Sequence, residues 1–221
     1  MKLFQTIKKS FHQAKSYLGS PNGKPGFTMI ELLIVIAILG ILAIAVLAAI
    51  NPIEQINRGR DTGSRSDAEQ LISAIDRFYA FNGYYPWQTG AADTANTALA
   101  WTQFEDSSSF TDSGGTCKVA EKLGTATTAG CTGSDELKQS FLERVSDPSY
   151  NFLYVYNDGT QGSSTYACFA PVSQAFVQEV NNRLDPDGDG TLDNYPSDYP
   201  ASDAIGNTAE CGAAGNCVCL P

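Results

Sequence analysis

The feature that most constrains this chain is a run of 19 residues without a charge, from Leu32 to Ile50. A helix rises about 1.5 Å per residue, so this run would cover roughly 28 Å, close to the hydrocarbon thickness of a bilayer. The run is apolar on every side, whereas a helix on the surface of a soluble domain is apolar on one face only. It therefore predicts a membrane-spanning helix.

Basic residues are concentrated before this run. Of the 14 basic residues, five lysines lie in residues 1–26, which contain no acid, and all 24 acidic residues follow them. Because positive residues stay on the cytoplasmic side, we expect the N-terminus in the cytoplasm and the body of the chain outside. The body is more negative than the formal charge of −10 for the whole chain.

This charge distribution excludes several functions. An acidic body binds a phosphate backbone poorly, so direct contact with nucleic acid is not expected unless a local patch at Lys118, Lys122 and Lys138 is used. The only histidine, His12, lies in the basic segment. The body therefore cannot form a Ser-His-Asp or Cys-His site or a histidine-ligated zinc, and we expect no enzymatic activity.

One acidic residue does not fit a plain anchor. Glu31 stands at the start of the apolar run, between Ile30 and Leu32. A carboxylate in the bilayer costs on the order of 2.5–3.5 kcal/mol even on the lenient insertion scale. A simple anchor would have no reason to carry it, although an acid placed at the membrane interface is the alternative explanation.

The residues around Glu31 carry a resemblance to a known family. Gly26-Phe27-Thr28-Met29-Ile30-Glu31 and the apolar residues after it resemble the prepilin signature of type IV pilins and pseudopilins. The resemblance implies that prepilin peptidase cuts after Gly26 on the cytoplasmic side and that Phe27 is then N-methylated. A secretory signal peptide cut near Ala43–Ala45 and a permanent one-pass anchor are alternatives, disfavoured by the long basic segment and by Glu31.

Cleavage after Gly26 would give Glu31 a partner. The new α-amine on Phe27 would lie four residues, or about 6 Å of helix rise, from Glu31. If the helices pack into the shared core of a filament, the Glu31 carboxylate can pair with the Phe27 ammonium of a neighbouring subunit. Leaving a buried charge unpaired costs about 3–5 kcal/mol, so the pair would set the axial register of assembly. The partners implied are like or related subunits, prepilin peptidase and an inner-membrane assembly platform.

The overall pattern predicts an α+β fold in three parts. Residues 1–26 form the leader peptide, and residues 27–82 form one long helix, transmembrane or in the filament core over 27–50. After Pro52, apolar residues recur every three to four positions, as in the amphipathic part of a helix. Residues 83–221 are expected to form an extracytoplasmic globular head, with a small antiparallel sheet packed on the helix as in type IV pilins.

The head begins with a segment that favours loops and helices. Residues 88–134 are rich in Ala, Thr, Ser, Gly and Asp, which predicts an exposed loop with one short helix near Ala98–Phe104. Ser134 is expected to cap a helix over Asp135–Val145. Asp147-Pro148 then ends this helix.

Strands are expected further along. Phe152–Tyr156 and Thr165–Ala170 are rich in aromatic and β-branched residues and flank a turn signal at Asn157-Asp158-Gly159. They predict a hairpin. Residues 174–183 fit either a short helix or a third strand.

Six cysteines lie after the membrane run, at 117, 131, 168, 211, 217 and 219. An oxidising compartment and an even number favour three disulfides, in one of 15 connectivities. We favour Cys117–Cys131, which closes a loop worth roughly 3 kcal/mol by the chain-entropy argument. Cys168 would then pair with Cys211, Cys217 or Cys219. A zinc site at the last three is an alternative that lacks a C-x-x-C pair and a histidine.

An acidic motif, Leu184-Asp185-Pro186-Asp187-Gly188-Asp189-Gly190-Thr191-Leu192-Asp193, indicates a calcium loop over 185–198. Its Asp side chains at 185, 187, 189 and 193 and the Thr191 carbonyl match the first two-thirds of an EF-hand loop. The motif is similar to the calcium loops of thrombospondin-type and dockerin repeats. Pro196 replaces the glutamate at the twelfth position, where Asp198 could supply an oxygen. A solvated acidic turn is the alternative.

Together these features predict a structural subunit of a type IV pilus that serves adhesion, motility or DNA uptake. It would be a single-pass precursor in the inner membrane with its head outside, and then part of an extracellular filament. The alternative is a pseudopilin of a type II secretion system in a periplasmic pseudopilus, which resembles this chain in its long helix and calcium loop. Against this, Asp147-Pro148 is followed by Ser149-Tyr150, where that family has a Trp-Gly-x-Pro-Tyr pattern.

Overall fold

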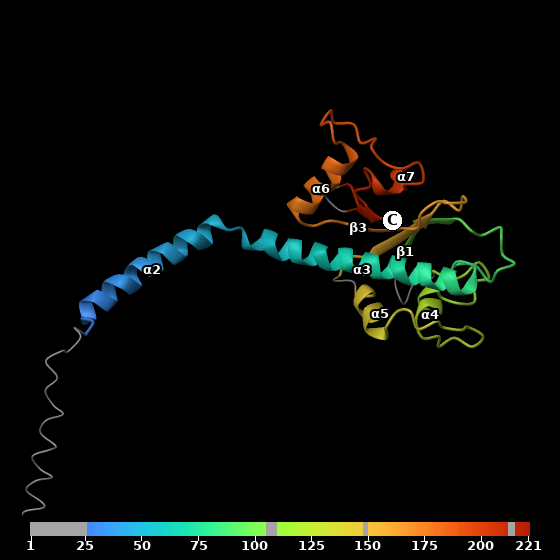
Figure 1. Ribbon diagram of the computed structural model, residues 1–221, viewed down its shortest axis with the longest axis horizontal. Helices are drawn as coiled ribbons and strands as arrows, with labels where there is room; N and C mark the ends of the chain where they lie inside the picture. The colour runs from blue at the N-terminus through green and yellow to red at the C-terminus, as the bar shows by residue number, and fades with distance from the viewer. Residues whose placement is uncertain (1–25, 105–109, 148–149, 212–214) are drawn as a thin grey trace, which may run out of the picture. The chain divides into compact units, whose positions relative to one another are not determined.

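The computed structural model describes residues 26–104, 110–147, 150–211 and 215–221 (Figure 1). The chain divides into two compact units, Met1–Asn51 and Pro52–Pro221. The predicted leader, except for Gly26, lies outside the described residues, and so do Pro148 and Ser149.

The first unit consists of helix α2, Met29–Ala49, which has no buried residue. Its 21 residues correspond to about 31 Å. Within the described part of the chain, it is the helix that is long and apolar enough to cross a membrane. The helix ends at Ala49, and the backbone of the next residue, Ile50, is extended with φ −99° and ψ 129°.

The second unit begins with helix α3, Pro52–Asn82. The long helix expected over residues 27–82 is interrupted at Asn51-Pro52, where the sequence favours a kink, so that α2 and α3 are separate helices. The cause is Pro52, since the ring of a proline disfavours the helical conformation in the residue before it. Proline is well suited to the first position of a helix, where its missing N–H is not needed.

A four-stranded antiparallel sheet packs against α3, in the order β1-β2-β3-β4 (Figure 1). Its strands are β1 Leu99–Phe104, β2 Leu153–Asn157, β3 Tyr166–Phe169 and β4 Val218–Leu220. The expected combination of an apolar helix, a long helix and a small antiparallel sheet is confirmed. The hairpin predicted from the two aromatic-rich segments is β2–β3, with Leu153 opposite Phe169 and Val155 opposite Ala167.

The segment Ala98–Phe104, expected to be helical, contains strand β1 instead. Thr102, Gln103 and Phe104 pair with β2, and the register shifts between Leu99 and Thr102. The Trp101 ring stacks on Tyr154 of β2 with 5.0 Å between centroids. Pairing with a neighbouring strand thus decides the conformation, because strand preference depends on cross-strand packing more than on local sequence.

The hydrophobic core lies between α3 and the sheet. It contains large side chains that are almost fully buried, including Leu71 and Ile75 of α3 and Phe104, Leu153, Val155, Phe169 and Val218 of the sheet. The residues 88–134 also contribute, through helix α4 (Val119–Leu123), whose Val119 and Leu123 are buried. This segment is therefore part of the core and not only the exposed loop that its composition predicts.

The remaining helices are α5 (Gln139–Val145), α6 (Gln174–Leu184) and α7 (Ala201–Ala204). In Figure 1, α4 and α5 lie on one side of α3, and α6 and α7 lie on the other. The predicted start of α5 is wrong, because the Ser134 hydroxyl donates to the Lys122 carbonyl oxygen at 2.8 Å and Asp135 has φ +54°. The segment left open between helix and strand is helix α6, which Ser173 caps through the Phe176 N–H.

Two acids of α3 hold the start of α6. The Asp61 carboxylate, which is fully buried, accepts hydrogen bonds from the N–H groups of Val172 and Ser173 at 2.7–3.1 Å. Glu54 accepts from the next two N–H groups, of Gln174 and Ala175, at 3.2 Å. The first N–H groups of a helix have no partner within it and carry partial positive charge, so these acids fix α6 on α3.

Three disulfides join the cysteines: Cys117–Cys131, Cys168–Cys219 and Cys211–Cys217. The first is the pair that the sequence favours, and Cys168 takes the last of its three possible partners. Cys168 and Cys219 lie directly opposite each other on β3 and β4. This bond therefore attaches the end of the chain to the centre of the sheet.

We predict that the disulfides differ in their contribution to stability. Replacing Cys168 and Cys219 by serine should lower the free energy of unfolding by about 4 kcal/mol, because their sequence separation of 51 closes a long loop in the unfolded chain. Replacing Cys211 and Cys217, with a separation of 6, should cost about 2 kcal/mol. Urea unfolding of the full chain in detergent measures both, and equal losses would contradict the loop-length argument.

Candidate functional site

The start of the first unit contains the residues expected to take part in processing and assembly. Gly26 and Phe27 precede α2, and the Phe27 side chain is 84% exposed. The proposed cleavage point therefore lies outside the helix, in the extended segment before it.

Glu31 takes part in a capping box at the start of α2. The Thr28 hydroxyl accepts a hydrogen bond from the Glu31 N–H at 3.2 Å, and the Thr28 N–H donates to Glu31 Oε2 at 3.2 Å. The Thr28 hydroxyl also lies 3.3 Å from the same carboxylate oxygen. This pattern satisfies two N–H groups that a helix end leaves unpaired. The sequence analysis missed this role, although the spacing Thr-x-x-Glu is its signal.

The acidic loop brings together three of the predicted ligands. Carboxylate oxygens of Asp185, Asp187 and Asp189 lie within 4.8 Å of one another. Gly190 has φ +88°, as the tight turn at the sixth position of an EF-hand loop requires. The loop closes at its base, where the Leu184 carbonyl oxygen accepts from the N–H groups of Asp193 and Asn194.

Backbone N–H groups stabilise the charge at the first position of this loop. Asp185 accepts hydrogen bonds from the N–H groups of Gly188, Asp189 and Gly190 at 2.8–3.1 Å. Desolvation would raise the pKa of Asp185, but these hydrogen bonds, that of Gly190 first, outweigh it and hold the pKa below its usual value. Asp185 is therefore ionised at neutral pH.

The other predicted ligands lie differently. The Thr191 N–H donates to Asp189 Oδ1 at 2.7 Å, which keeps Thr191 beside the cluster, whereas Asp193 is not part of the group of three. Asp198 accepts from the Ser164 N–H at 2.8 Å and from the Tyr166 hydroxyl at 3.1 Å. Both of its oxygens thus contact β3 and the segment before it, so they are engaged away from the loop.

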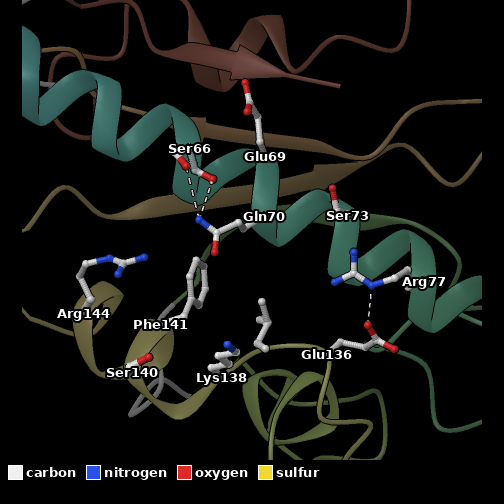
Figure 2. A pocket seen from close by; sticks show the side chains of 11 residues that line it. Ser66, Glu69, Gln70, Ser73, Arg77, Glu136, Lys138, Ser140, Phe141 and Arg144 are labelled. Carbon is white, nitrogen blue, oxygen red and sulfur yellow. Dashed lines mark hydrogen bonds and ion pairs between the residues drawn. The ribbon is translucent and has the colours of Figure 1, made fainter.

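A groove of about 510 Å³ lies between α3 and the segment 136–144 (Figure 2). Ion pairs line it. The Arg77 Nε lies 2.5 Å from Glu136 Oε2, and Arg144, which is also at the groove, is 2.5 Å from Asp67. The hydrogen bonds that Arg144 donates to the Asp67 carboxylate raise the pKa of Arg144 above its usual value. We interpret the ion pairs at this groove as polar contacts that hold α5 to α3.

The basic patch considered for nucleic acid does not form a common surface. Lys122 is buried, and its Nζ lies 3.0 Å from Asp112 Oδ2 and 2.5 Å from the Gln88 carbonyl oxygen. Burial would raise the pKa of Asp112, but Lys122 and the N–H groups of Thr116 and Cys117 lower it. Lys122 is therefore a structural cation and is not available to phosphate.

Comparison with known protein families gives a match, which lies within the first unit. Residues 22–47 match the family described as prokaryotic N-terminal methylation motif. The match includes Gly26, Phe27, Glu31 and most of α2. Comparisons with curated proteins and with solved structures found no match. The resemblance seen in the sequence is thus confirmed: residues 22–47 are the prepilin signature of type IV pilins and pseudopilins.

Proposed function

We propose that this protein is a structural subunit of a type IV pilus, assembled from the membrane after cleavage by prepilin peptidase. The observation that carries the proposal is α2, an apolar helix within the prepilin signature that has no buried residue. The bilayer covers this helix in the precursor, and like helices cover it in the filament. The head would supply the outer surface for adhesion, motility or DNA uptake.

Glu31 would direct the transfer between these two environments. Cleavage after Gly26 creates an ammonium group on Phe27, and N-methylation keeps its charge. In the filament core, this ammonium would pair with Glu31 of a neighbouring subunit. The capping box keeps the carboxylate at the N-terminal end of α2, close to where that group must arrive.

A pseudopilin of a type II secretion system is the second candidate, because that family resembles this chain in its long helix and calcium loop. The same cleavage and helix packing would then build a short periplasmic filament. The loop geometry at Asp185, Asp187 and Asp189 is compatible with both candidates.

We predict that surface material contains a processed chain. Its N-terminus should be Phe27, heavier by one methyl substitution, because cleavage and methylation are coupled in the proposed pathway. Mass spectrometry of the N-terminal peptide measures this. A chain that begins at Met1, or beyond Ala45, would contradict the proposal.

We predict that Glu31 acts through its charge and not only through the capping box. Glu31→Gln retains a side chain that can complete the box, whereas Glu31→Ala does not. Both variants should be cleaved normally and yield few filaments, as judged from the sheared fraction against the membrane fraction. The matched control is Thr28→Ala, which weakens the cap by about 1 kcal/mol and should still assemble. Normal assembly of Glu31→Gln would remove the charge argument.

We also propose that the acidic loop holds a structural Ca²⁺ ion. Oxygen ligands suit this ion, and the residues that would hold it are Asp185, Asp187 and Asp189 with the Thr191 carbonyl. The donor set fits only in part, because Pro196 has no side-chain oxygen and Asp198 contacts Ser164 and Tyr166. Such a partial set matches the weak sites of extracellular modules, with Kd of roughly 10⁻⁴–10⁻³ M.

We predict that calcium raises the thermal stability of the full chain in detergent. At ten times Kd, the gain in unfolding free energy should be about 1.4 kcal/mol, and chelation should reverse it. Asp187→Asn should abolish the rise in Tm, whereas Asp203→Asn, which removes an acid outside the cluster, should not. No rise with calcium in the unmodified chain would exclude the site.

A further inference from the structure

A second cavity lies in the head, beside the acidic loop and separate from the groove of Figure 2. It has a volume of about 220 Å³ and lies between the end of α6, the strands β3 and β4 and the segment 194–199. Its lining includes Tyr166, Arg183, Asn194, Tyr195, Tyr199 and Cys219. Cavities for drug-sized ligands measure about 300–1,000 Å³. This one therefore suits a single ring.

Aromatic rings form its walls. The Tyr199 ring lies between two others, 5.5 Å from Tyr166 in an edge-on arrangement and 5.5 Å from Tyr195 at a tilt of 31°. Tyr195 is 38% exposed at the mouth, whereas Tyr166 and Tyr199 are buried. The face of an aromatic ring is electron-rich, so it attracts the polarised C–H groups on one side of a sugar ring.

The cavity also contains a buried hydroxyl that has room for a further hydrogen bond. Tyr199 is only 6% exposed, and within the described residues its hydroxyl forms no hydrogen bond of regular geometry, although the Arg183 side chain lies near enough to interact with it. A buried hydroxyl without a well-aligned hydrogen bond is unfavourable, and a hydroxyl group of a ligand would supply one. Burial raises the pKa of Tyr199, and the nearby Arg183 partly offsets this rise, so the phenol stays protonated at neutral pH.

Two further side chains can contact a ligand at the same place. Arg183 donates one N–H to the Cys219 carbonyl oxygen at 2.9 Å and has no carboxylate partner within the described ranges. Asn194 donates its amide N–H to the Arg183 carbonyl oxygen at 2.9 Å, which leaves its Oδ1 as an acceptor. The cavity thus offers donors and acceptors together, as a ring with several hydroxyl groups requires.

The surrounding charge selects against an acidic ligand. The chain around the cavity contains Asp185, Asp187, Asp189, Asp193 and Asp198. Arg183 is the only basic residue from Tyr166 to the last residue of the sequence. An anion would be repelled by these carboxylates, whereas a neutral ring with hydroxyl groups would not. A cation would be repelled by Arg183 in the cavity wall.

We propose that this cavity binds a single neutral hexopyranose residue at the end of a glycan. Tyr195 stacks on one face of the sugar, and Tyr199, Arg183 and Asn194 bind its hydroxyl groups. The inference rests on the proposed function only in placing the head outside the cell. Binding by purified subunits does not require filaments, so its failure and a failure of assembly are distinguishable.

The test uses the full chain in a polyoxyethylene detergent, because a detergent with a sugar headgroup would compete. The probes are the methyl glycosides of glucose, galactose, mannose and N-acetylglucosamine, with methyl glucuronide as the anionic comparison, followed by saturation-transfer NMR. At least one neutral glycoside should bind and should bind more tightly than the glucuronide. Absence of binding by all the neutral probes, or tighter binding of the glucuronide, would overturn the proposal.

Variants locate the binding in the cavity. Tyr195→Ala should abolish binding, and Tyr199→Phe, which keeps the ring, should weaken it roughly fivefold, the worth of one hydrogen bond. Phe81→Ala is the matched control, because Phe81 is an aromatic residue of α3 that is 82% exposed, and binding should be unchanged. Unchanged binding in Tyr195→Ala and Tyr199→Phe, with the thermal stability of both intact, would overturn the assignment to this cavity.

Discussion

The burial of α2 is the interaction on which the proposed role of the molecule depends. None of its 21 residues is buried by the part of the chain that the structure describes, and each exposed Leu, Ile or Val is worth about 1.5–3 kcal/mol when buried. A bilayer and a bundle of like helices both provide this burial. Because lipid tails are as apolar as leucine, the apolar term changes little between the two environments. In the proposed filament, close packing and polar contacts must therefore favour assembly, and Glu31 would be the polar group that α2 brings into it.

The capping box changes how Glu31 should be understood. A carboxylate at the third helical position is already useful within one subunit, because Thr28 and Glu31 satisfy each other's backbone N–H groups. The same geometry holds the charge at the end of the helix where a new ammonium group would appear after cleavage. An intramolecular cap and an intermolecular ion pair are therefore compatible roles of one side chain, and only a charge-neutral substitution that preserves the cap separates them.

The sequence was informative where local pattern decides structure. The apolar run of α2, the β2–β3 hairpin and the Cys117–Cys131 bond follow from composition, turn residues and short spacing. It was misleading where distant contacts decide. β1 is a strand because β2 pairs with it, and α5 starts late because Ser134 bonds to Lys122 instead of capping. The acidic loop was recognised as a motif, but the contact between Asp198 and β3 could not be foreseen from spacing.

The C-terminal part of the head is fixed at two ends that lie far apart in the sequence. At one end Asp61 and Glu54 hold the start of α6, and Arg65 pairs with Glu179 at 2.5 Å. At the other end the Cys168–Cys219 bond attaches β4 to the sheet. The acidic loop and the tyrosine-lined cavity lie between these attachments. These attachments hold both ends of the segment, and Leu184 and Tyr199 within it are part of the hydrophobic core. The exposed residues of the acidic loop can therefore vary in chemistry with little effect on the fold, as is expected where a rigid scaffold presents a binding surface.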